Sequence, residues 1–302
     1  MSIVLGVDIG GSHITAALVD LNSRSVVAGS NKRRLVNSQA SAEEIIHDWC
    51  EVINSALNGR PDVLQRIGIA MPGPFNYEEG ISLIKDQDKF KALYNMNIKN
   101  ILAKRLAVKA EHILFMNDAV CFLQGEVFGG SAREFDQVLG ITLGTGLGSA
   151  TYKEGTAVDA DLWKTPFKDG IAEDYLSTRW FVNRYQELGG KLFSGVKEMM
   201  ETDGSSLLVK KLFDEFSQTL AQFLLPQIEK YKSEAVVFGG NISNAFPLFQ
   251  PALQTNFLAN NIGIELKKAQ LSEDALLIGA ASCWKRVNGQ TIAKQGSKIS
   301  RA

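Results

Sequence analysis

The chain has few cysteines and no excess of charge of either sign. Its three cysteines, Cys50, Cys121 and Cys283, stand far apart, which excludes a structural zinc site built from closely spaced cysteines. Scattered cysteines are typical of a reducing compartment. Lys and Arg number 32 and Asp and Glu 33, so no basic excess indicates nucleic-acid binding.

Long apolar runs are also missing. No stretch approaches the ~20 apolar residues of a membrane span, and the N-terminus enters a strand-like run without a signal-peptide pattern. We therefore expect a cytoplasmic protein that binds neither membranes nor nucleic acids. At 302 residues the chain exceeds the usual size of a single core, which predicts two domains.

Three glycine-rich segments each follow or lie within an apolar, strand-like run. In the first, Asp8 precedes Gly10, Gly11 and Ser12, and the residues that follow stay apolar and β-branched. Because no capped helix begins there, we interpret Gly10-Gly11 as a hairpin turn whose backbone amides can bind phosphate oxygens. Taken alone, the segment fits an ordinary glycine-rich hairpin equally well.

The second and third glycine segments strengthen the phosphate-binding interpretation. Gly144, Thr145 and Gly146 again connect two strand-like runs, and two such turns facing each other across a cleft would hold phosphates from both sides. The third segment, Gly239-Gly240-Asn241, would let an adenine ring lie against the backbone. Its alternative interpretation is a strand-to-helix turn of any α/β protein.

A strand-like run over residues 113–116 ends in Asn117 and Asp118, before a predicted helix over 120–128. Both polar side chains would lie at the carboxyl edge of a sheet, where α/β proteins bind their ligands. The alternative is that one of them only caps the helix. Together with the glycine segments, Asp118 could take the proton from a sugar hydroxyl that attacks a γ-phosphoryl group.

A long helix is predicted over about 207–231. It carries Leu212, Phe216 and Phe223 on one face, which is the pattern of a core-facing stripe. Pro226 predicts a kink or a restart within this helix.

In this order, the segments resemble the ROK family, which groups bacterial sugar kinases, polyphosphate glucokinases and sugar-responsive repressors. The resemblance runs from Gly6 to about Ala281 and includes the loop Met71-Pro72-Gly73-Pro74-Phe75. It implies an α/β chain with the two-domain, actin-like ATPase (ribonuclease H-like) fold and a central cleft.

The resemblance also implies the domain organisation. We expect an N-terminal α/β domain over residues 1–116, joined by a C-terminal helix over 274–288. Residues 117–302 would form a second α/β domain with nucleotide and sugar contacts.

The resemblance implies roles for individual residues. Asp118 would be the general base and Asn117 a sugar ligand, while Gly73 would help to shape the sugar pocket. Asp8 would hold Mg²⁺ through water, which suits an ion that dehydrates reluctantly. The implied ATP contacts come from all three glycine segments: Asp8, Gly10, Gly11, Ser12, Gly144, Thr145, Gly146, Gly239, Gly240 and Asn241.

The chain departs from the family in one loop. Many members carry a Cys-rich zinc loop that ends in a substrate-binding Glu, and the tail of that loop resembles residues 170–177 here. This makes Glu173 the candidate sugar-binding carboxylate, with a residue that merely favours a helix N-terminus as the alternative. Asp161 and Lys164 keep the spacing of the family's Glu and His, so Asp161 is a second candidate.

Without zinc, the loop needs another source of packing. We expect Trp163, Pro166 and Phe167 to provide it.

The predicted function is ATP-dependent phosphorylation of a glucose-like hexose by a homodimeric, cytoplasmic sugar kinase. Polyphosphate is the alternative donor, and the sequence leaves the identity of the sugar open. The alternative function is a non-catalytic, sugar-sensing regulator without the helix-turn-helix that precedes the kinase-like domain in the family's repressors.

Overall fold

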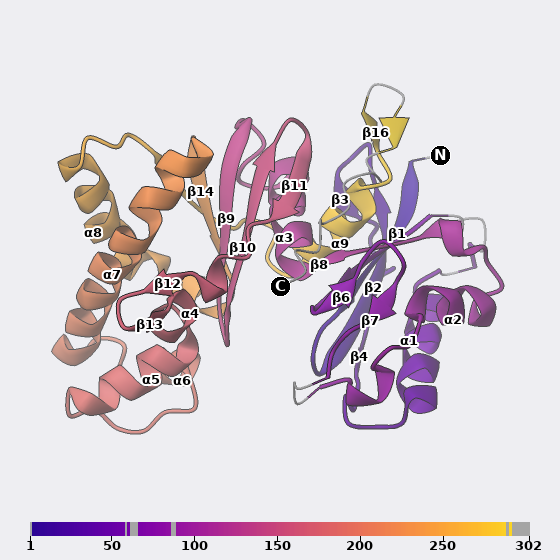
Figure 1. Ribbon diagram of the computed structural model, residues 1–302, viewed down its shortest axis with the longest axis horizontal. Helices are drawn as coiled ribbons and strands as arrows, with labels where there is room; N and C mark the ends of the chain where they lie inside the picture. The colour runs from indigo at the N-terminus through magenta and orange to yellow at the C-terminus, as the bar shows by residue number, and fades with distance from the viewer. Residues whose placement is uncertain (1, 58, 61–65, 86–88, 288–289, 292–302) are drawn as a thin grey trace. The chain divides into compact units, whose positions relative to one another are not determined.

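The computed structural model describes residues 2–57, 59–60, 66–85, 89–287 and 290–291. It divides into two units, one comprising Met1–Gly129 with Glu273–Ala302 and the other Gly130–Ser272 (Figure 1). The division follows Gly129 rather than residue 116, where the sequence analysis set it. The reason is that helix α3 (Asp118–Gly129) packs on the C-terminal helix α9 (Asp274–Ser282) of unit 1.

Unit 1 is built on a six-stranded sheet. Its strands follow the order β3-β2-β1-β5-β8, and β4 pairs with β2. β1 and β2 form an antiparallel hairpin, whereas β1, β5 and β8 run parallel. The strands are β1 (Ile3–Ile9), β2 (His13–Asp20), β3 (Ser25–Val26), β4 (Lys32–Leu35), β5 (Ile67–Met71) and β8 (Ile113–Asn117).

The helices of unit 1 lie on both faces of this sheet. They are α1 (Ala42–Leu57), α2 (Ile98–Arg105), α3 (Asp118–Gly129) and α9 (Asp274–Ser282), with the 3-10 turns η2 (Lys91–Leu93) and η3 (Ala110–His112). Two small hairpins complete the unit: β6 (Phe75–Asn76) with β7 (Ile81–Ser82), and β16 (Arg286–Val287) with β17 (Gln290–Thr291).

Alternate residues of β1 face different layers. Leu5 and Val7 join the apolar core that includes Trp49 of α1. Gly6 faces the other way, and a Cβ there would lie 2.3 Å from the carbonyl oxygen of Leu277 in α9. Because successive strand residues point to opposite faces, α1 and α9 cover opposite sides of the sheet (Figure 1).

The C-terminal helix is shorter than predicted. α9 ends at Ser282, so the prediction of a helix through 288 was wrong; residue 288 itself lies outside the described residues. The backbone N–H groups of Trp284 and Lys285 donate to carbonyls three residues earlier, at 3.1 and 2.8 Å. These tighter turns end the α-helical pattern before β16.

Unit 2 contains a five-stranded sheet in the order β11-β10-β9-β14-β15. β9, β10 and β11 are antiparallel, and β14 runs parallel to both β9 and β15. The strands are β9 (Gln137–Leu143), β10 (Leu147–Lys153), β11 (Thr156–Asp159), β14 (Ala235–Gly239) and β15 (Glu265–Lys268), with a separate hairpin of β12 (Pro166–Phe167) and β13 (Gly170–Ile171).

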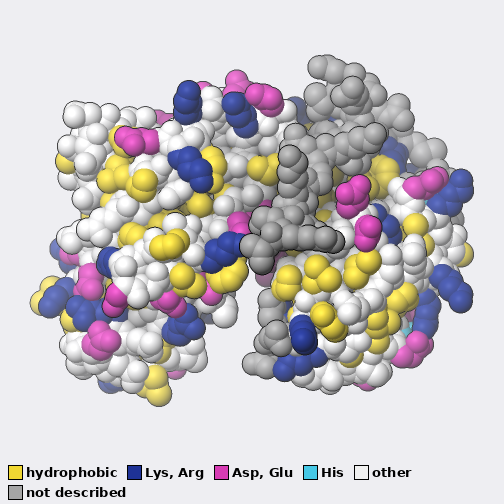
Figure 2. All heavy atoms as spheres, in the orientation of Figure 1, with side chains coloured by type: hydrophobic (Ala, Val, Ile, Leu, Met, Phe, Trp, Pro, Cys, Tyr) yellow, Lys and Arg dark blue, Asp and Glu magenta, His cyan; other side chains and the backbone are white. Residues whose placement is uncertain are grey.

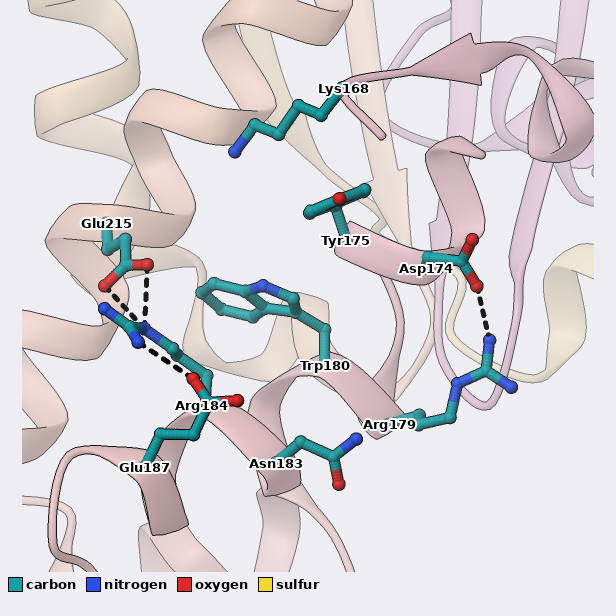
Figure 3. A pocket seen from close by; sticks show the side chains of 9 residues that line it. All are labelled: Lys168, Asp174, Tyr175, Arg179, Trp180, Asn183, Arg184, Glu187 and Glu215. Carbon is teal, nitrogen blue, oxygen red and sulfur yellow. Dashed lines mark hydrogen bonds and ion pairs between the residues drawn. The ribbon is translucent and has the colours of Figure 1, made fainter. Parts of the chain in front are cut away.

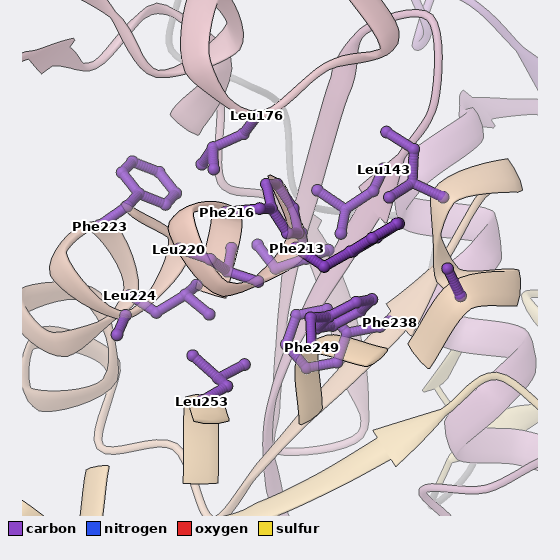
Figure 4. Close-up of a cluster of buried hydrophobic side chains, with 14 of the residues drawn as sticks. Leu143, Leu176, Phe213, Phe216, Leu220, Phe223, Leu224, Phe238, Phe249 and Leu253 are labelled. Carbon is purple, nitrogen blue, oxygen red and sulfur yellow. The ribbon is translucent and has the colours of Figure 1, made fainter. Parts of the chain in front are cut away.

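Helices of unit 2 pack around a core rich in phenylalanine (Figure 4). Phe216 of the long helix α7 contacts Phe249 at 5.6 Å between ring centroids, and Phe249 contacts Phe238 of β14 at 5.7 Å. Helix α7 runs unbroken through Pro226. The helical elements are η4 (Leu162–Lys164), α4 (Ala172–Tyr175), α5 (Thr178–Glu187), α6 (Val196–Asp203), α7 (Leu207–Tyr231), η5 (Asn241–Ala245) and α8 (Phe246–Ala259).

Charged side chains of both signs are interspersed on the face that Figure 2 shows, in keeping with the nearly equal numbers of acidic and basic residues. Within the described ranges, no helix has the length and apolar character needed to cross a membrane.

Candidate active site

The turn between β1 and β2 offers backbone amides to a ligand. The Gly10 N–H donates to the His13 carbonyl at 2.9 Å and closes the turn, which confirms the predicted hairpin. Within the described part of the chain, the N–H groups of Gly11 and Ser12 donate to no protein acceptor. The turn can therefore direct two donors at an anion.

Asp8 lies two residues after Gly6, on the same face of β1. Its Oδ2 is 3.5 Å from Nε2 of His13, and its side chain is 13% exposed. A Cβ at Gly10 would lie 2.6 Å from Cε1 of His13, so glycine leaves room for the imidazole ring. The partly exposed Asp8 carboxylate is a hard oxygen ligand beside the turn, which fits a hydrated magnesium ion.

Asn117 and Asp118 stand where β8 passes into α3. Asn117 Oδ1 accepts hydrogen bonds from the N–H groups of Ala119 at 2.8 Å and Val120 at 3.3 Å. Asp118 Oδ1 accepts a further bond from Ala119 N–H at 2.9 Å. Asn117 therefore does cap the helix, as the alternative interpretation held. Asp118 is the first residue of α3, directly after this cap.

Asp8 and Asp118 lie at the same edge of the sheet of unit 1. Asp8 is the next-to-last residue of β1 and Asp118 directly follows β8, and these two parallel strands flank β5. The pKa of the Cys121 thiol in α3 is raised well above its usual value, mainly by burial, and nearby Cys283, Asp118 and Asp8 add to the increase. Only β5 separates the two strands that carry these carboxylates, so unit 1 places both along one edge of its sheet.

Gly73 lies in the loop between β5 and β6. A Cβ there would lie 3.2 Å from the Tyr77 hydroxyl oxygen. The same hydroxyl accepts a hydrogen bond from Asn117 Nδ2 at 3.3 Å, so Gly73 and Asn117 share a neighbour. Tyr77 was not predicted as a site residue, because a single tyrosine in a loop belongs to no recognisable sequence motif.

The second glycine turn, between β9 and β10, is also a hairpin. The Gly144 N–H donates to the Gly146 carbonyl at 3.1 Å, and the N–H and hydroxyl groups of Thr178 both donate to the Gly144 carbonyl at 2.8 Å. In the described ranges the N–H groups of Thr145 and Gly146 donate to no protein acceptor. This turn therefore offers two donors, as the first one does.

Glu173 contacts this second turn directly. Its Oε2 accepts a hydrogen bond from the Leu147 N–H at 2.9 Å. A Cβ at Gly146 would lie only 2.5 Å from the same oxygen, so glycine allows the carboxylate to approach. Glu173 also lies in the first turn of α4, as the alternative interpretation predicted. The contact with the turn was not predicted.

The third glycine segment lies beside the second. Gly239 pairs with Thr142 of β9, and Gly240 has a φ of 80°. A Cβ on Gly240 would lie 2.3 Å from the Leu143 carbonyl oxygen. Only glycine fits this close approach, and it brings Asn241 next to the strand that ends in the second turn.

Asp161 occupies a left-handed conformation with a φ of 51°, directly before η4. Its carboxylate forms an ion pair with Lys164. The Ala172 N–H, next to Glu173, donates to the Thr165 carbonyl at 2.9 Å. The segments that carry Asp161 and Glu173 are therefore linked within unit 2.

The predicted packing of this loop is only partly correct. The Phe167 ring packs against Tyr175 and Phe223, with centroid distances of 5.6 and 5.5 Å. In contrast, Trp163 is 43% exposed and Pro166 is also exposed, so neither is a core residue of the loop. In the described ranges, no group of three or more His, Cys, Asp or Glu side chains could hold a metal ion.

A separate hollow of about 450 Å³ opens on unit 2 (Figure 3). Its arginines are engaged in ion pairs: Arg184 with Glu215 at 2.9 Å, and Arg179 with Asp174 at 2.8 Å. The first pair ties α5 to α7, a structural role. Its lining is Lys168, Asp174, Tyr175, Arg179, Trp180, Asn183, Arg184, Glu187 and Glu215, none of which the sequence analysis selected.

The predicted site residues thus form two sets. Unit 1 holds the first glycine turn, Asp8, Gly73, Asn117 and Asp118; unit 2 holds the other two glycine segments with Asp161 and Glu173. That the two sets face each other across a cleft stays a prediction.

The chain is similar to known proteins over most of its length. The sequence profile of the ROK family matches residues 4–159, more than half of the chain. The chain is 24% identical to a glucokinase from Thermotoga maritima, over 95% of this chain and 98% of that protein. It is also 24% identical to an N-acetyl-D-glucosamine kinase from Pectobacterium carotovorum, over 81% of this chain and 86% of that protein.

Solved structures show the same fold. A ROK family glucokinase from Streptomyces griseus, solved in complex with glucose and AMPPNP, matches with a TM-score of 0.73 at 22% identity. The match covers 93% of this chain and 98% of that one. The predicted α/β fold of the actin-like ATPase class is confirmed.

Proposed function

The chain belongs to the ROK family, and from this premise we propose that it transfers the γ-phosphoryl group of ATP to a hydroxyl group of a glucose-like hexose. The observation that supports the proposal is the placement of Asp8, Asp118 and the β1–β2 turn along one edge of the sheet of unit 1, with two turn amides that donate to no acceptor among the described residues. Phosphoryl transfer needs a base for the acceptor hydroxyl, donors for the phosphates and a site for a cation. This edge of the sheet offers a candidate for each of the three.

In the proposed mechanism, Asp118 accepts the proton of the attacking hydroxyl. The sugar oxygen forms its bond to the γ-phosphorus while the bond from phosphorus to the bridging oxygen breaks, and ADP leaves. The amides of Gly11 and Ser12 would bind phosphate oxygens, which stabilises charge without reorganisation. Asp8 would hold hydrated Mg²⁺, which neutralises phosphate charge when bound.

Unit 2 would supply the other contacts. The amides of Thr145 and Gly146 suit a second phosphate, and the close backbone of Gly240 suits the flat face of a base. Glu173 and Asp161 are the proposed sugar carboxylates. The glucokinase and the N-acetyl-D-glucosamine kinase that resemble the chain favour a hexose or hexosamine as acceptor. We further propose a cytoplasmic homodimer, in line with the ATP requirement and the family.

The test is ADP release by the purified protein with Mg-ATP against a panel of hexoses and hexosamines. Asp118→Asn keeps an oxygen that can accept from Ala119 N–H, so the helix start survives while the base is lost. We expect its turnover to fall about 10²- to 10⁴-fold. Asp214→Asn, an exposed position on α7, is the matched control and should retain full activity.

Two results would count against the kinase. No turnover with any sugar, while sugar or ATP still binds by calorimetry, would leave the sugar-sensing regulator as the better function. Undiminished turnover in Asp118→Asn would remove Asp118 from the mechanism. Replacing ATP by polyphosphate in the same assay decides between the two donors.

A further inference from the structure

Tyr77 is held against the strand that carries Asn117. Its ring packs on Phe75 at a centroid distance of 5.3 Å, and Phe75 packs on Phe115 of β8 at 5.0 Å. Phe115 and Asn117 stand two residues apart on one strand and so share a face. The aromatic stack therefore fixes the position of the Tyr77 hydroxyl relative to the Asn117 side chain.

The hydrogen bonds of the Tyr77 hydroxyl have a defined direction. Its O–H donates to the Met71 carbonyl oxygen at 3.1 Å, because a carbonyl can only accept. The hydroxyl oxygen also accepts a hydrogen bond, from Asn117 Nδ2 at 3.3 Å. The amide nitrogen of Asn117 is therefore directed toward Tyr77.

The other end of the Asn117 amide is fixed as well. Its Oδ1 accepts from the N–H groups of both Ala119 and Val120, so a flipped amide would set N–H groups against N–H groups. One N–H goes to Tyr77. The second N–H has no hydrogen-bond partner among the residues that the structure describes. Asn117 can offer a ligand one donor, and its oxygen is already used twice.

We propose that Tyr77 is a positioning residue that makes Asn117 a donor-only ligand of the sugar. This inference rests on the proposed function. A hydroxyl that accepts from Asn117 keeps its own proton for another acceptor, and the neighbouring Asp118 carboxylate can only accept. In the proposed complex, Asn117 donates a hydrogen bond to a sugar oxygen, and Asp118 accepts one from a sugar hydroxyl group.

The test uses Tyr77→Phe, which removes one oxygen and keeps the aromatic stack. Loss of one neutral hydrogen bond should raise KM for the sugar about 3- to 10-fold and leave KM for ATP unchanged. Tyr94→Phe is the matched control, because Tyr94 is 41% exposed in the same unit. It should behave as the wild type.

A second measurement distinguishes positioning of the Asn117 amide by Tyr77 from a purely structural role of Tyr77. Monofluoro and monodeoxy analogues of the accepted sugar are compared by calorimetry, since organic fluorine accepts weakly and cannot donate. At the hydroxyl bound by Asn117, the wild type should bind the fluoro analogue more tightly than the deoxy analogue. In Tyr77→Phe the capping bonds still hold Oδ1, but Nδ2 loses the bond to the hydroxyl and can tilt away from the sugar, so this preference should shrink.

Equal KM values and equal analogue preferences in Tyr77→Phe and the wild type would overturn the inference while leaving the kinase intact. Absence of sugar binding by the wild type would overturn the proposed function and the inference with it. If Tyr77→Phe fails to fold, Asn117→Asp provides the decision. It keeps the capping oxygen but has no donor when ionised, so undiminished sugar binding by this variant would refute donor-only recognition.

Discussion

Helices α3 and α9 meet at a contact that only glycine allows, and this contact yields a sharp prediction for Gly279→Ala. A Cβ at Gly279 would lie 1.8 Å from the carbonyl oxygen of Cys121 and 2.9 Å from the backbone nitrogen of Gly125. Real Cβ atoms essentially never come closer than 3.0 Å to another heavy atom. The two helices must therefore separate by about 1 Å to accept one methyl group.

The magnitude follows from two opposing effects. Alanine is favoured over glycine inside a helix by about 1 kcal/mol. Overpacking costs about 1–3 kcal/mol, and the upper end applies here because the contacted atoms belong to the backbone and cannot rotate away. The free energy of unfolding of unit 1 should therefore fall by about 2 kcal/mol. For a unit of this size, that lowers the unfolding midpoint by about 4–8 °C.

The assay is calorimetric unfolding, in which the transition of unit 1 should move and that of unit 2 should stay. Gly263→Ala is the matched control, because nothing lies within 4 Å of a Cβ at Gly263. Its free energy of unfolding should match that of the wild type within about 0.5 kcal/mol. An unchanged midpoint in Gly279→Ala would refute the close contact between the helices, and with it our account of how α3 is held.

Two further predictions concern the site and the cysteines. Glu173→Gln keeps an acceptor for the Leu147 N–H, so the turn is preserved and KM for ATP should stay within about twofold. It removes the charge of the proposed sugar-binding carboxylate, so kcat/KM for the sugar should fall at least about tenfold. Glu173→Ala should impair both, and equal effects of the two variants on KM for ATP would contradict the contact with the turn. Burial raises the pKa of Cys283 to about 12 and that of Cys50 to about 11, and Cys121 is raised as well. No thiol of the native protein should react quickly with a disulfide reagent at pH 8, whereas all three should react after unfolding; a fast native reaction would show that one thiol is accessible.

The glycine turns were predictable because their information is local. Apolar, β-branched residues on both sides of Gly10-Gly11 can only continue as strands, and the hairpin follows from the turn. The long helix over 207–231 was equally accessible, since its apolar period extends over many turns. Pro226 did not break it, because packing of the apolar face outweighs one lost hydrogen bond.

The domain boundary was not predictable in the same way. The segment 118–129 reads as a helix in any context, and its assignment to unit 1 depends on contact with α9, about 150 residues later in the chain. Glycines such as Gly125 and Gly279 carry this contact, yet in a sequence they only lower the helix propensity. Only the position of the partner helix's backbone shows that these glycines are needed for close packing.

Within the site, too, contacts between near neighbours in the sequence could be predicted, whereas contacts between distant residues could not. Asn117 as a helix cap could be predicted, since its acceptor oxygen serves N–H groups two and three residues later. The bond from Leu147 to Glu173 joins residues 26 positions apart, and Tyr77 reaches Asn117 across 40 positions. No local pattern encodes either partner, although each one orients a candidate ligand.

Helix α3 sets the position of the proposed base. Asp118 is its first residue, Asn117 caps it, and its body lies against α9 at Gly125. The position of the carboxylate is thus set by backbone contacts remote from any ligand. A substitution that shifts α3 without touching the site should lower kcat more than it raises KM for either substrate, because a displaced base weakens the transition state while the binding groups of unit 2 stay intact. Measured on Gly279→Ala at a temperature where it is folded, a loss confined to KM would mean that Asp118 does not depend on α3 for its alignment.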